Sequence, residues 1–507
     1  MRRRQFLRSS AGAAAFSLFA QGARAQSRDP VALDALDLNG ATRTLPASSF
    51  KDLRDALNGP LIFSSDDGYD AARRLAWPPS RFDRRPAFIV RASGPADVAV
   101  AVTFARENNL LLSVKGGGHS DFGLGGQDGA MMLDLSLMRG VRIDAAQQRA
   151  EVAGATLAGL IDHETGAYGL AIPLGDTPTV GIGGLALGGG IGRIGRLYGL
   201  ATDAIRAADV VCADGRLRRA SPDENPDLFW ALHGGGGNFG VVTAFEFALH
   251  PMPPQVLAGQ VTFDYAQARE VLRAYGHFAA TAPDAMHGQM LIRRNQDDAT
   301  SFLQLDVCWS GPLAEGERAL ETIRRFGRVT GDTVKPMTYP AFQGATAHAG
   351  RSATSSQDRA TFFRSGFVDV LDDALVSTIV DALTPRPDRS FAVLFLHGGG
   401  EIARIDPSTS PFPHRTALHD MIFVTTWLKG PGEAEHRSEA TQIWQRLKPH
   451  TRGFYGNDMG GGVTPAEVAA NLGSNAARMA DIKARYDPSN LFRLNANIEP
   501  ASAPAHA

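Results

Sequence analysis

Apolar residues in the first half of the chain fall into short runs that predict buried strands. Such runs, bounded by turn residues, are typical of strands covered on both faces. Helical spacing of apolar residues predicts helices over 98–108 and 157–165, with shorter ones over 70–75 and 228–232. The strands expected in this half are 86–91, 110–114, 130–135, 140–144, 149–152, 205–212 and 241–249.

The pattern changes after residue 251, where strands alternate with longer helices. This order favours an antiparallel sheet with helices packed on one face. A last helix is expected over 469–486. The other helices expected here are 266–281, 313–326, 374–383 and 433–447, and the strands are 289–293, 302–309, 391–397 and 421–427.

Glycine is both frequent and clustered. It accounts for 55 of 507 residues, above the usual ~7%, and the clusters lie at 116–118, 181–192 and 234–240. Clustered glycines let a backbone approach a ligand and turn N–H groups toward it. Together the clusters predict a long, phosphate-bearing ligand held along its length, although each alone is compatible with an ordinary turn or helix cap.

The run Gly190-x-Gly192-x-x-Gly195 fits a dinucleotide-binding fingerprint by its letters only. That fingerprint needs a hydrophobic strand directly before it, whereas this run lies inside a glycine-rich stretch. The sequence therefore gives no support to a nicotinamide-dependent dehydrogenase.

His119 follows three glycines at the end of an expected strand. An imidazole there can reach a ligand pressed on the loop, and its nitrogen can act as a nucleophile toward an electrophilic carbon. The alternative is a hydrogen-bonded histidine in a tight turn, which the spacing alone favours.

Residues 1–25 predict a cleaved export signal. A basic start, a short Ala-rich apolar stretch and the A-x-A site Ala23-Arg24-Ala25 are its parts. The pair Arg3-Arg4 is similar to a twin-arginine signal, so we expect a periplasmic or secreted protein that is folded around its cofactor before export. A general secretory signal rich in arginine is the alternative.

Charge and cysteine content exclude several classes of protein. Without residues 1–25 the chain has 46 basic and 53 acidic residues, so it lacks the basic surplus of a nucleic-acid-binding protein. Cys212 and Cys308 are too few for a disulfide framework, a multi-cysteine zinc site or a cysteine-ligated iron–sulfur cluster, and no metal site is expected. No later stretch is apolar enough to predict a transmembrane helix.

Four segments of the chain carry a family resemblance. They are VKGGGHSDFGLG (114–125), GDTPTVGIGGLALGGGIGRIGRLYGL (175–200), ENPDLFWALHGGGGNFGVVTAFEF (224–247) and ARYDPSNLFRLNANI (484–498). Together they resemble the berberine-bridge-enzyme-like FAD oxidoreductases, which have the PCMH-type FAD-binding fold of the vanillyl-alcohol-oxidase family. The resemblance implies an α+β fold, with a two-part FAD-binding domain beside an antiparallel-sheet substrate domain and a C-terminal segment that returns to the FAD domain. The expected boundaries are 26–79 for an N-terminal segment, 80–251 for the FAD-binding domain, 252–450 for the substrate domain and 451–500 for the C-terminal segment.

The resemblance implies that His119 bonds covalently to the 8α-methyl group of the flavin. Relatives with a second bond use a cysteine in a G-x-C-P segment, where this chain has Thr177, so one bond is expected. Val180 matches the position that controls oxygen access in relatives, and valine there favours an oxidase. The cofactor-binding residues implied are Lys115, Gly116, Gly117, Gly118, His119, Ser120, Gly175, Asp176, Thr177, Val180, Gly181, Gly184, Gly188, Gly190, Gly192, Gly240, Val241, Val242, Asn495 and Asn497.

Hydride transfer from a carbon that bears a hydroxyl group needs a base for the O–H proton. Related carbohydrate and alcohol oxidases use a tyrosine in a Y-x-N segment, which Tyr455-Gly456-Asn457 matches. Tyr455 is therefore the candidate base and Asn457 a substrate candidate, although a tyrosine packed at a domain seam fits the sequence equally well. His397 and Arg415 are further substrate candidates, with a hydrogen-bonded strand histidine and a solvated arginine as alternatives.

These observations predict an FAD-dependent oxidoreductase, more specifically an oxidase. It would pass hydride from an alcohol, a sugar or a secondary metabolite to flavin N5, and O2 or another acceptor would reoxidise the flavin. The partners expected are a small-molecule substrate and that acceptor. The alternative is a flavin-bearing binding or electron-carrier protein that oxidises no substrate.

Overall fold

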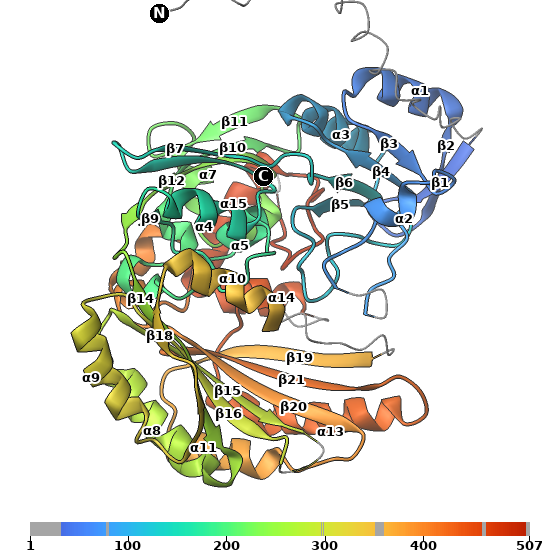
Figure 1. Ribbon diagram of the computed structural model, residues 1–507. Coiled ribbons are helices and arrows are strands. Elements are labelled where there is room, and N and C mark those ends of the chain that lie inside the picture. Colours follow the sequence, from blue (N-terminus) through green and yellow to red (C-terminus); the bar gives the residue numbers. More distant parts are fainter. Residues whose placement is uncertain are drawn as a thin grey trace, which may run out of the picture.

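The computed structural model describes residues 32–77, 81–295, 297, 299–349, 359–458 and 463–502, without the side chains of 346–349. The expected export signal, residues 1–25, lies outside these ranges. In Figure 1 an upper body, built from the first half of the chain and the C-terminal segment, stands above a lower body that is one broad sheet with helices beneath it. Within the described ranges, no helix is both long and apolar enough to cross a membrane.

A small mixed sheet forms the first part of the upper body. Strands β4 and β5 both run parallel to β6, and β3 pairs antiparallel with β4. Helix α3 (Pro95–Glu107) connects β4 to β5 and buries Val98, Ala101 and Val102, which share one helical face. The strands are β3 (Leu61–Phe63), β4 (Phe88–Arg91), β5 (Leu112–Lys115) and β6 (Met131–Asp134).

Residues 32–77 pack into this same body, although their sequence shows little periodicity. Strand β3 belongs to the mixed sheet, and Phe50 is fully buried in its core. The other elements are β1 (Ala32–Leu36), β2 (Thr42–Pro46), α1 (Ala47–Ala56) and α2 (Tyr69–Ala72). The strands here are too short to show a repeating apolar pattern, and α1 buries only Phe50 and Leu53. The helix expected near 70–75 is present as α2.

An antiparallel sheet with strand order β11-β10-β12-β8-β7 forms the second part of the upper body. Its core contains Val210, Phe245 and Phe247, which are almost completely buried. The two-part organisation expected for this half is therefore confirmed. The elements are β7 (Val141–Asp144), β8 (Arg149–Ala153), β10 (Ile205–Val211), β11 (Leu217–Ala220), β12 (Val241–Ala248), the short pair β9 (Leu170–Ala171) and β13 (His250–Pro251), α4 (Ala158–Gly166), α5 (Ile182–Leu187), α6 (Gly195–Tyr198) and α7 (Pro226–Ala231).

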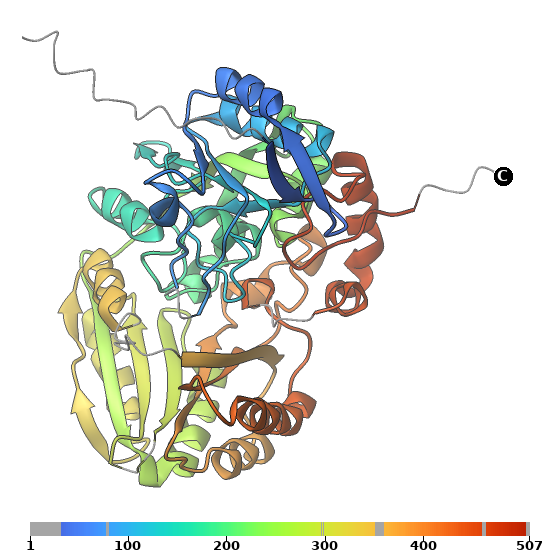
Figure 2. The ribbon, with the colours of Figure 1, turned by 90° about the vertical axis from the view of Figure 1, so that its right-hand side faces the viewer.

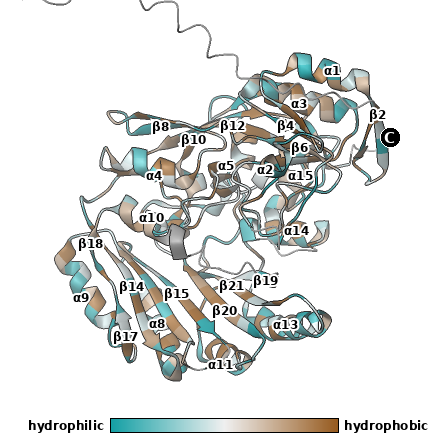
Figure 3. Cartoon of the chain, turned by 45° about the vertical axis from the view of Figure 1, so that its right-hand side comes forward, coloured by the Kyte–Doolittle hydropathy of each residue, from teal (hydrophilic) through white to brown (hydrophobic). Residues whose placement is uncertain are grey.

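The lower body is an antiparallel sheet with strand order β17-β14-β16-β15-β20-β21-β19, and β18 also pairs with β14. Helices α8, α9, α11 and α13 cover the face that points away from the upper body (Figures 1 and 2). Figure 3 shows strands that are brown along much of their length above helices of mixed colour, as expected for amphipathic helices on a buried face. The antiparallel sheet with helices on one face is therefore confirmed.

The expected strands of this half are present and mostly somewhat longer than expected, whereas α8 begins and α9 ends inside the expected ranges; α10, α12 and several strands were not expected. The strands are β14 (Val256–Asp264), β15 (Met286–Arg294), β16 (Phe302–Trp309), β17 (Val329–Asp332), β18 (Lys335–Met337), β19 (Arg359–Val368), β20 (Arg389–His397) and β21 (His419–Leu428), and the helices are α8 (Ala268–Thr281), α9 (Leu313–Ile323), α10 (Tyr339–Ala349), α11 (Asp373–Ala382), α12 (Glu401–Arg404) and α13 (Glu433–Leu447).

The single helix expected over 469–486 is wrong. Helix α14 (Pro465–Leu472) ends at Gly473, whose φ of 55° lies in the left-handed region, and α15 (Ala476–Tyr486) begins after it. The first helix starts earlier than expected because Thr464 and Glu467 form a capping box. Both helices pack on the core of the second upper sheet, so the C-terminal segment returns to the upper body as expected.

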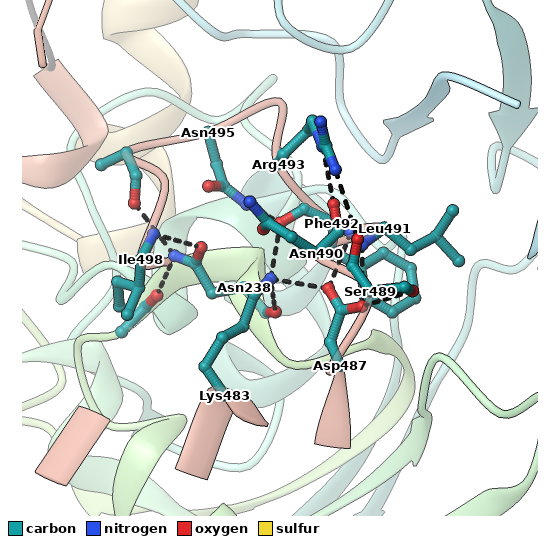
Figure 4. Close-up of polar contacts among 12 residues, drawn as sticks. Asn238, Lys483, Asp487, Ser489, Asn490, Leu491, Phe492, Arg493, Asn495 and Ile498 are labelled. Carbon is teal, nitrogen blue, oxygen red and sulfur yellow. Dashed lines mark hydrogen bonds and ion pairs between the residues drawn. The ribbon is translucent and has the colours of Figure 1, made fainter. Parts of the chain in front are cut away.

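A buried ion pair holds the chain end that follows α15. Lys483 Nζ donates to Asp487 Oδ2 (2.6 Å) and to the carbonyls of Asn238 (2.7 Å) and Phe492 (3.0 Å), and neither charged side chain is exposed to solvent (Figure 4). Asn238 also binds the chain further on, because its side-chain Oδ1 accepts a hydrogen bond from the Ile498 N–H (2.9 Å). The segment after residue 487 is therefore tied to the glycine-rich loop at 234–240.

Replacing Lys483 by methionine should destabilise the protein by about 3 kcal/mol or more, because it leaves the Asp487 carboxylate buried without its cation. Lys51→Met is the matched control, since Lys51 and Asp55 form a pair at the same i,i+4 spacing on an exposed helix face, where loss costs about 0.5 kcal/mol. Denaturant midpoints of the two variants test this. Equal midpoints would contradict a stabilising role for the buried pair.

Candidate functional site

One large cavity opens between the upper and lower bodies. Its volume of about 1160 Å³ exceeds the roughly 300–1,000 Å³ usual for a pocket that holds one small molecule. All three glycine clusters line it, together with the segment around Asn495 and the inner face of the lower sheet. A cavity of this size and composition has room for a dinucleotide and a second, smaller molecule.

Most of the expected cofactor-binding residues meet at this cavity. Those that line it are Lys115, Gly116, Gly117, Gly118, His119, Ser120, Gly175, Asp176, Thr177, Val180, Gly181, Gly184, Gly188, Gly240, Val241, Val242 and Asn495.

Three of the expected cofactor residues lie elsewhere: Gly190, Gly192 and Asn497 do not line the cavity. A Cβ on Gly192 would lie 1.6 Å from the Leu174 carbonyl oxygen, so this glycine allows two backbone segments to pack. The Gly190 N–H donates to a side chain of the C-terminal segment. Gly190 and Gly192 were expected at the ligand because they lie in a glycine-rich run. In the structure they allow close packing within the protein.

Two glycine loops touch each other along their backbones at the centre of the cavity wall. A Cβ on Gly117 would lie 2.3 Å from the Gly181 nitrogen, and a Cβ on Gly181 would lie 2.4 Å from the Gly117 nitrogen. Any side chain at either position would push a backbone away. The loop after β5 and the start of α5 therefore form one continuous wall only because both residues are glycine.

The backbone at His119 is fixed by two residues near the expected start of the FAD-binding domain, Trp77 and Arg81. Trp77 Nε1 donates to the carbonyls of His119 (3.1 Å) and Ser120 (3.0 Å). Arg81 stacks 4.0 Å from the centre of the Trp77 ring and binds Asp121 Oδ1 (2.8 Å). The loop that carries the imidazole is therefore held by contacts at three consecutive residues, 119–121. Sequence patterning missed Trp77 and Arg81, whose only signal is an aromatic and basic run without periodicity.

A buried network positions the loop at 175–177. Gln343 Nε2 donates to the Gly175 carbonyl (2.9 Å) and to Asp162 Oδ2 (3.3 Å), and Gln343 Oε1 accepts a hydrogen bond from Arg193. Arg193 also donates to the Asp176 carbonyl (3.0 Å). Burial raises the pKa of Asp162 to about 7, against the lowering effects of Gln343 and Arg193. Helix α10 of the lower body thus fixes a loop of the upper body.

The phenol of Tyr455 lines the cavity and is held by two donors. Its oxygen accepts the Gly190 N–H (2.7 Å) and the Asn457 Nδ2–H (2.8 Å), and Asn457 also donates to the Leu185 carbonyl (3.0 Å). Burial raises the pKa of Tyr455 and the Asp458 carboxyl raises it further, whereas the two donors lower it. The phenol is therefore protonated at neutral pH and must release its own proton when it takes one.

A pair of buried carboxyl groups lies next to this phenol. Asp458 lines the cavity, and its backbone N–H donates to the Tyr455 carbonyl (3.0 Å). Asp420 on β21 is 1% exposed, and its carboxyl lies near enough to that of Asp458 for ionisation of one group to oppose ionisation of the other. Burial raises the pKa of both groups, and the charge of Asp420 raises that of Asp458 further. The pair is a place where a proton can be held.

His397 and Arg415 do not line the cavity, which corrects their expected role as substrate residues. His397 lies on the helix-covered face of β20, where its Nε2–H donates to the Ala279 carbonyl of α8 (3.1 Å) and burial lowers its pKa. Arg415 is 1% exposed and bonds to both carboxylate oxygens of Asp203 (2.6 and 3.0 Å). Sequence spacing could not show that His397 would face the helices or that Arg415, in the segment before β21, would bind Asp203.

The residues around the cavity fit FAD. The touching glycine loops form a wall that a Cβ would fill, and successive backbone N–H groups at 116–118 suit a pyrophosphate. Asn495 Oδ1 is buried at the wall and has no hydrogen-bond partner among the described residues, so it is available to a bound molecule. Among all the residues that the structure describes, no group of three or more His, Cys, Asp or Glu side chains is arranged as metal ligands.

Asp162→Asn should remove a pH-dependent loss in the free energy of unfolding. Because the native pKa is raised above its ordinary value near 4, native Asp162 keeps a proton that the unfolded chain releases, and stability falls as pH rises from about 4 to 7. Relative to this variant, the wild type should lose about 2–3 kcal/mol between pH 5 and 8. Unfolding midpoints at both pH values, with the exposed Asp481→Asn as control, test this. Parallel changes in wild type and D162N would contradict the account.

Comparison with known proteins agrees with this geometry. A family model described as an FAD binding domain matches residues 86–221, and one described as berberine and berberine like matches residues 469–499. (R)-6-hydroxynicotine oxidase of Paenarthrobacter nicotinovorans is 31% identical over 88% of this chain and 97% of that protein. Xylooligosaccharide oxidase of Thermothelomyces thermophilus is 39% identical over 83% and 88%, respectively.

A solved structure of glucooligosaccharide oxidase from Acremonium strictum superposes with a TM-score of 0.79, at 25% identity, over 90% of this chain and 100% of that one. Sequence, fold and cavity therefore lead to the same assignment. The chain belongs to the berberine-bridge-enzyme-like FAD-linked oxidoreductases of the vanillyl-alcohol-oxidase, PCMH-type family.

Proposed function

We propose that this protein is an FAD-dependent oxidase that carries its flavin on a single covalent bond to His119 and uses Tyr455 to take a proton from the substrate. The observation that carries the proposal is that both side chains line one cavity, although they come from opposite ends of the chain. Relatives whose names describe hydroxynicotine and oligosaccharide oxidases support oxidation of a small molecule.

One covalent bond is favoured by the residues at the cavity wall. The glucooligosaccharide oxidase above is described as carrying a 6-S-cysteinyl, 8α-N1-histidyl FAD. Here Thr177 lines the cavity at the expected cysteine position, and the two cysteines Cys212 and Cys308 are buried and do not line it. A tethered cofactor also suits the proposed export by residues 1–25, because dilution cannot remove it.

The residues at the cavity wall would have distinct roles. The glycine loops would hold the pyrophosphate by backbone N–H groups, and Val180 would control the access of oxygen to the flavin. Bound FAD supplies the hydride acceptor and returns electrons to O2. Tyr455 receives the proton from the substrate O–H or N–H and passes its own proton toward the ionised member of the Asp420–Asp458 pair.

His119→Ala should release the flavin when the protein is precipitated with acid, whereas wild-type protein should keep its yellow colour in the pellet, because a covalent bond survives unfolding. His163→Ala on the exposed side of α4 is the control and should behave as wild type. Absorbance of the supernatant gives the result. Flavin released from the wild type would rule out the covalent bond.

Tyr455→Phe should slow reduction of the flavin by substrate about 10²- to 10⁴-fold, because the variant keeps the ring and loses the proton acceptor. Anaerobic stopped-flow measurement of flavin bleaching gives this rate, and Tyr168→Phe at an exposed position is the control. An unchanged rate in Y455F would remove Tyr455 from the mechanism.

A further inference from the structure

The inner face of the lower sheet, which forms one wall of the cavity, is divided into a polar and an apolar half. Strands β14, β16 and β15 contribute the polar patch and β15, β20 and β21 contribute the aliphatic patch, and all these residues line the cavity. The polar patch is Gln260, Gln289, Arg293, Gln304 and Asp306. The aliphatic patch is Leu291, Ala392, Leu394, Leu396, Ile422 and Val424. Ser390 and Thr426, which also line the cavity, border this patch at one end of β20 and β21 and are hydrogen-bonded to each other (3.0 Å).

The strand register makes the aliphatic patch continuous. Leu291 pairs with Leu394, and Leu394 pairs with Ile422 on the next strand. Ala392 pairs with Val424, which lies opposite Phe363 of β19, another residue at the wall. Figure 3 shows β20 brown along most of its length. Both faces of this strand are thus apolar, although only one of them packs against helices.

The candidate base lies at the aliphatic end of the sheet. The Tyr455 ring packs against Phe367 of β19, with 6.4 Å between ring centres. Phe367 lies opposite Asp420, and Asp420 lies opposite Leu396. A molecule that reaches the Tyr455 phenol therefore lies near the end of the sheet where Leu396 and Ile422 line the cavity, with Asn457 and Asp458 as the polar groups beside the phenol.

Part of the polar patch lies far from the oxidised end of the molecule. Neighbouring strands are about 4.8 Å apart, so Gln304 on β16 lies roughly three strand spacings, about 14 Å, from β21. Arg293 on β15 is nearer, because it pairs with Ala392 of β20. The side chains on β14 and β16 can therefore hydrogen-bond only a remote substituent, whereas the wall over β20 and β21 is formed mainly by alkyl groups.

We infer that the substrate has a compact apolar body, an aromatic or alicyclic ring or a branched chain, and that it carries one hydroxyl or amino group on the carbon that is oxidised. This inference rests on the proposed function and names its substrate class. A sugar at this place would set several hydroxyl groups against alkyl side chains, and each hydroxyl buried without a partner lowers affinity roughly ten-fold or more. An apolar body gains affinity from the same contact.

Isothermal titration calorimetry of the purified holoprotein tests this with three probes: benzyl alcohol, benzylamine and xylobiose. Calorimetry needs no turnover, so binding is measured whether or not a probe is oxidised. At least one of the two aromatic probes should bind ten-fold or more tightly than xylobiose, and the better one shows whether the oxidised group is an alcohol or an amine. Equal or tighter binding of xylobiose would overturn the inference.

Leu394→Asn should weaken binding of the better aromatic probe about ten-fold or more and should not weaken xylobiose binding. Leu394→Met keeps the apolar surface and should retain affinity, which separates lost contact from misfolding. Leu428→Asn is the matched control, on β21 but 48% exposed and outside the cavity wall. An unchanged affinity in L394N would also overturn the inference.

The inference and the proposed function can fail separately. If xylobiose binds best and bleaches the flavin anaerobically, the oxidase proposal stands and the apolar-body inference is wrong. If the holoprotein binds the aromatic probes through Leu394 but no alcohol or amine of that shape reduces the flavin, the apolar site stands and the oxidase proposal fails.

Discussion

The close approach of two backbones at Gly117 and Gly181 is the constraint on which the rest of the site depends. One belongs to the loop that ends a mixed sheet and the other begins a helix of the neighbouring antiparallel sheet. Without a Cβ at either residue, the two parts of the upper body close into one wall. That wall bears His119 on one side and meets Tyr455 on the other, through Gly190 and Asn457.

The cavity also depends on residues that are distant in the sequence. Gln343 and Arg193 fix the loop that carries Thr177, and Lys483 fixes the segment that carries Asn495. These contacts are buried polar networks, in which each member needs all its partners. The lower sheet closes the cavity with a face that is partly polar and partly aliphatic. The strands over which a bound molecule lies therefore determine whether it contacts polar or alkyl side chains.

Much of the fold could be predicted from the sequence, because strong periodicity marks long elements. Helix α13 and strand β16 were visible in this way, and β16 alternates cleanly between helix-facing and cavity-facing residues. Among the elements before residue 77, only α2 was expected. The strands there are too short to show a period, and α1 buries only Phe50 and Leu53. The predicted helix over 469–486 ignored Gly473, whose conformation ends α14.

Site residues could be predicted where they belong to a sequence motif. They were harder to predict where tertiary packing determines whether a side chain faces the cavity. The glycine loops, His119, Tyr455 and Asn457 meet at one cavity, as their motifs indicated. His397 and Arg415 lie close to it in sequence and fold, yet they point into a helix-covered core and an ion pair. The aliphatic patch has a sequence signal that was overlooked, because residues 391–396 are apolar without alternation, which indicates a strand with two apolar faces.

The central claim is that FAD lies in the cavity bounded by the glycine loops. The most direct test is the molar ratio of flavin to purified chain, measured by absorbance for the wild type and for Gly117→Ala. The account predicts a ratio near one for the wild type and a much lower ratio for G117A, with Gly140→Ala, whose added Cβ meets no atom within 4 Å, as control. A colourless wild-type protein that takes up no added FAD would contradict it.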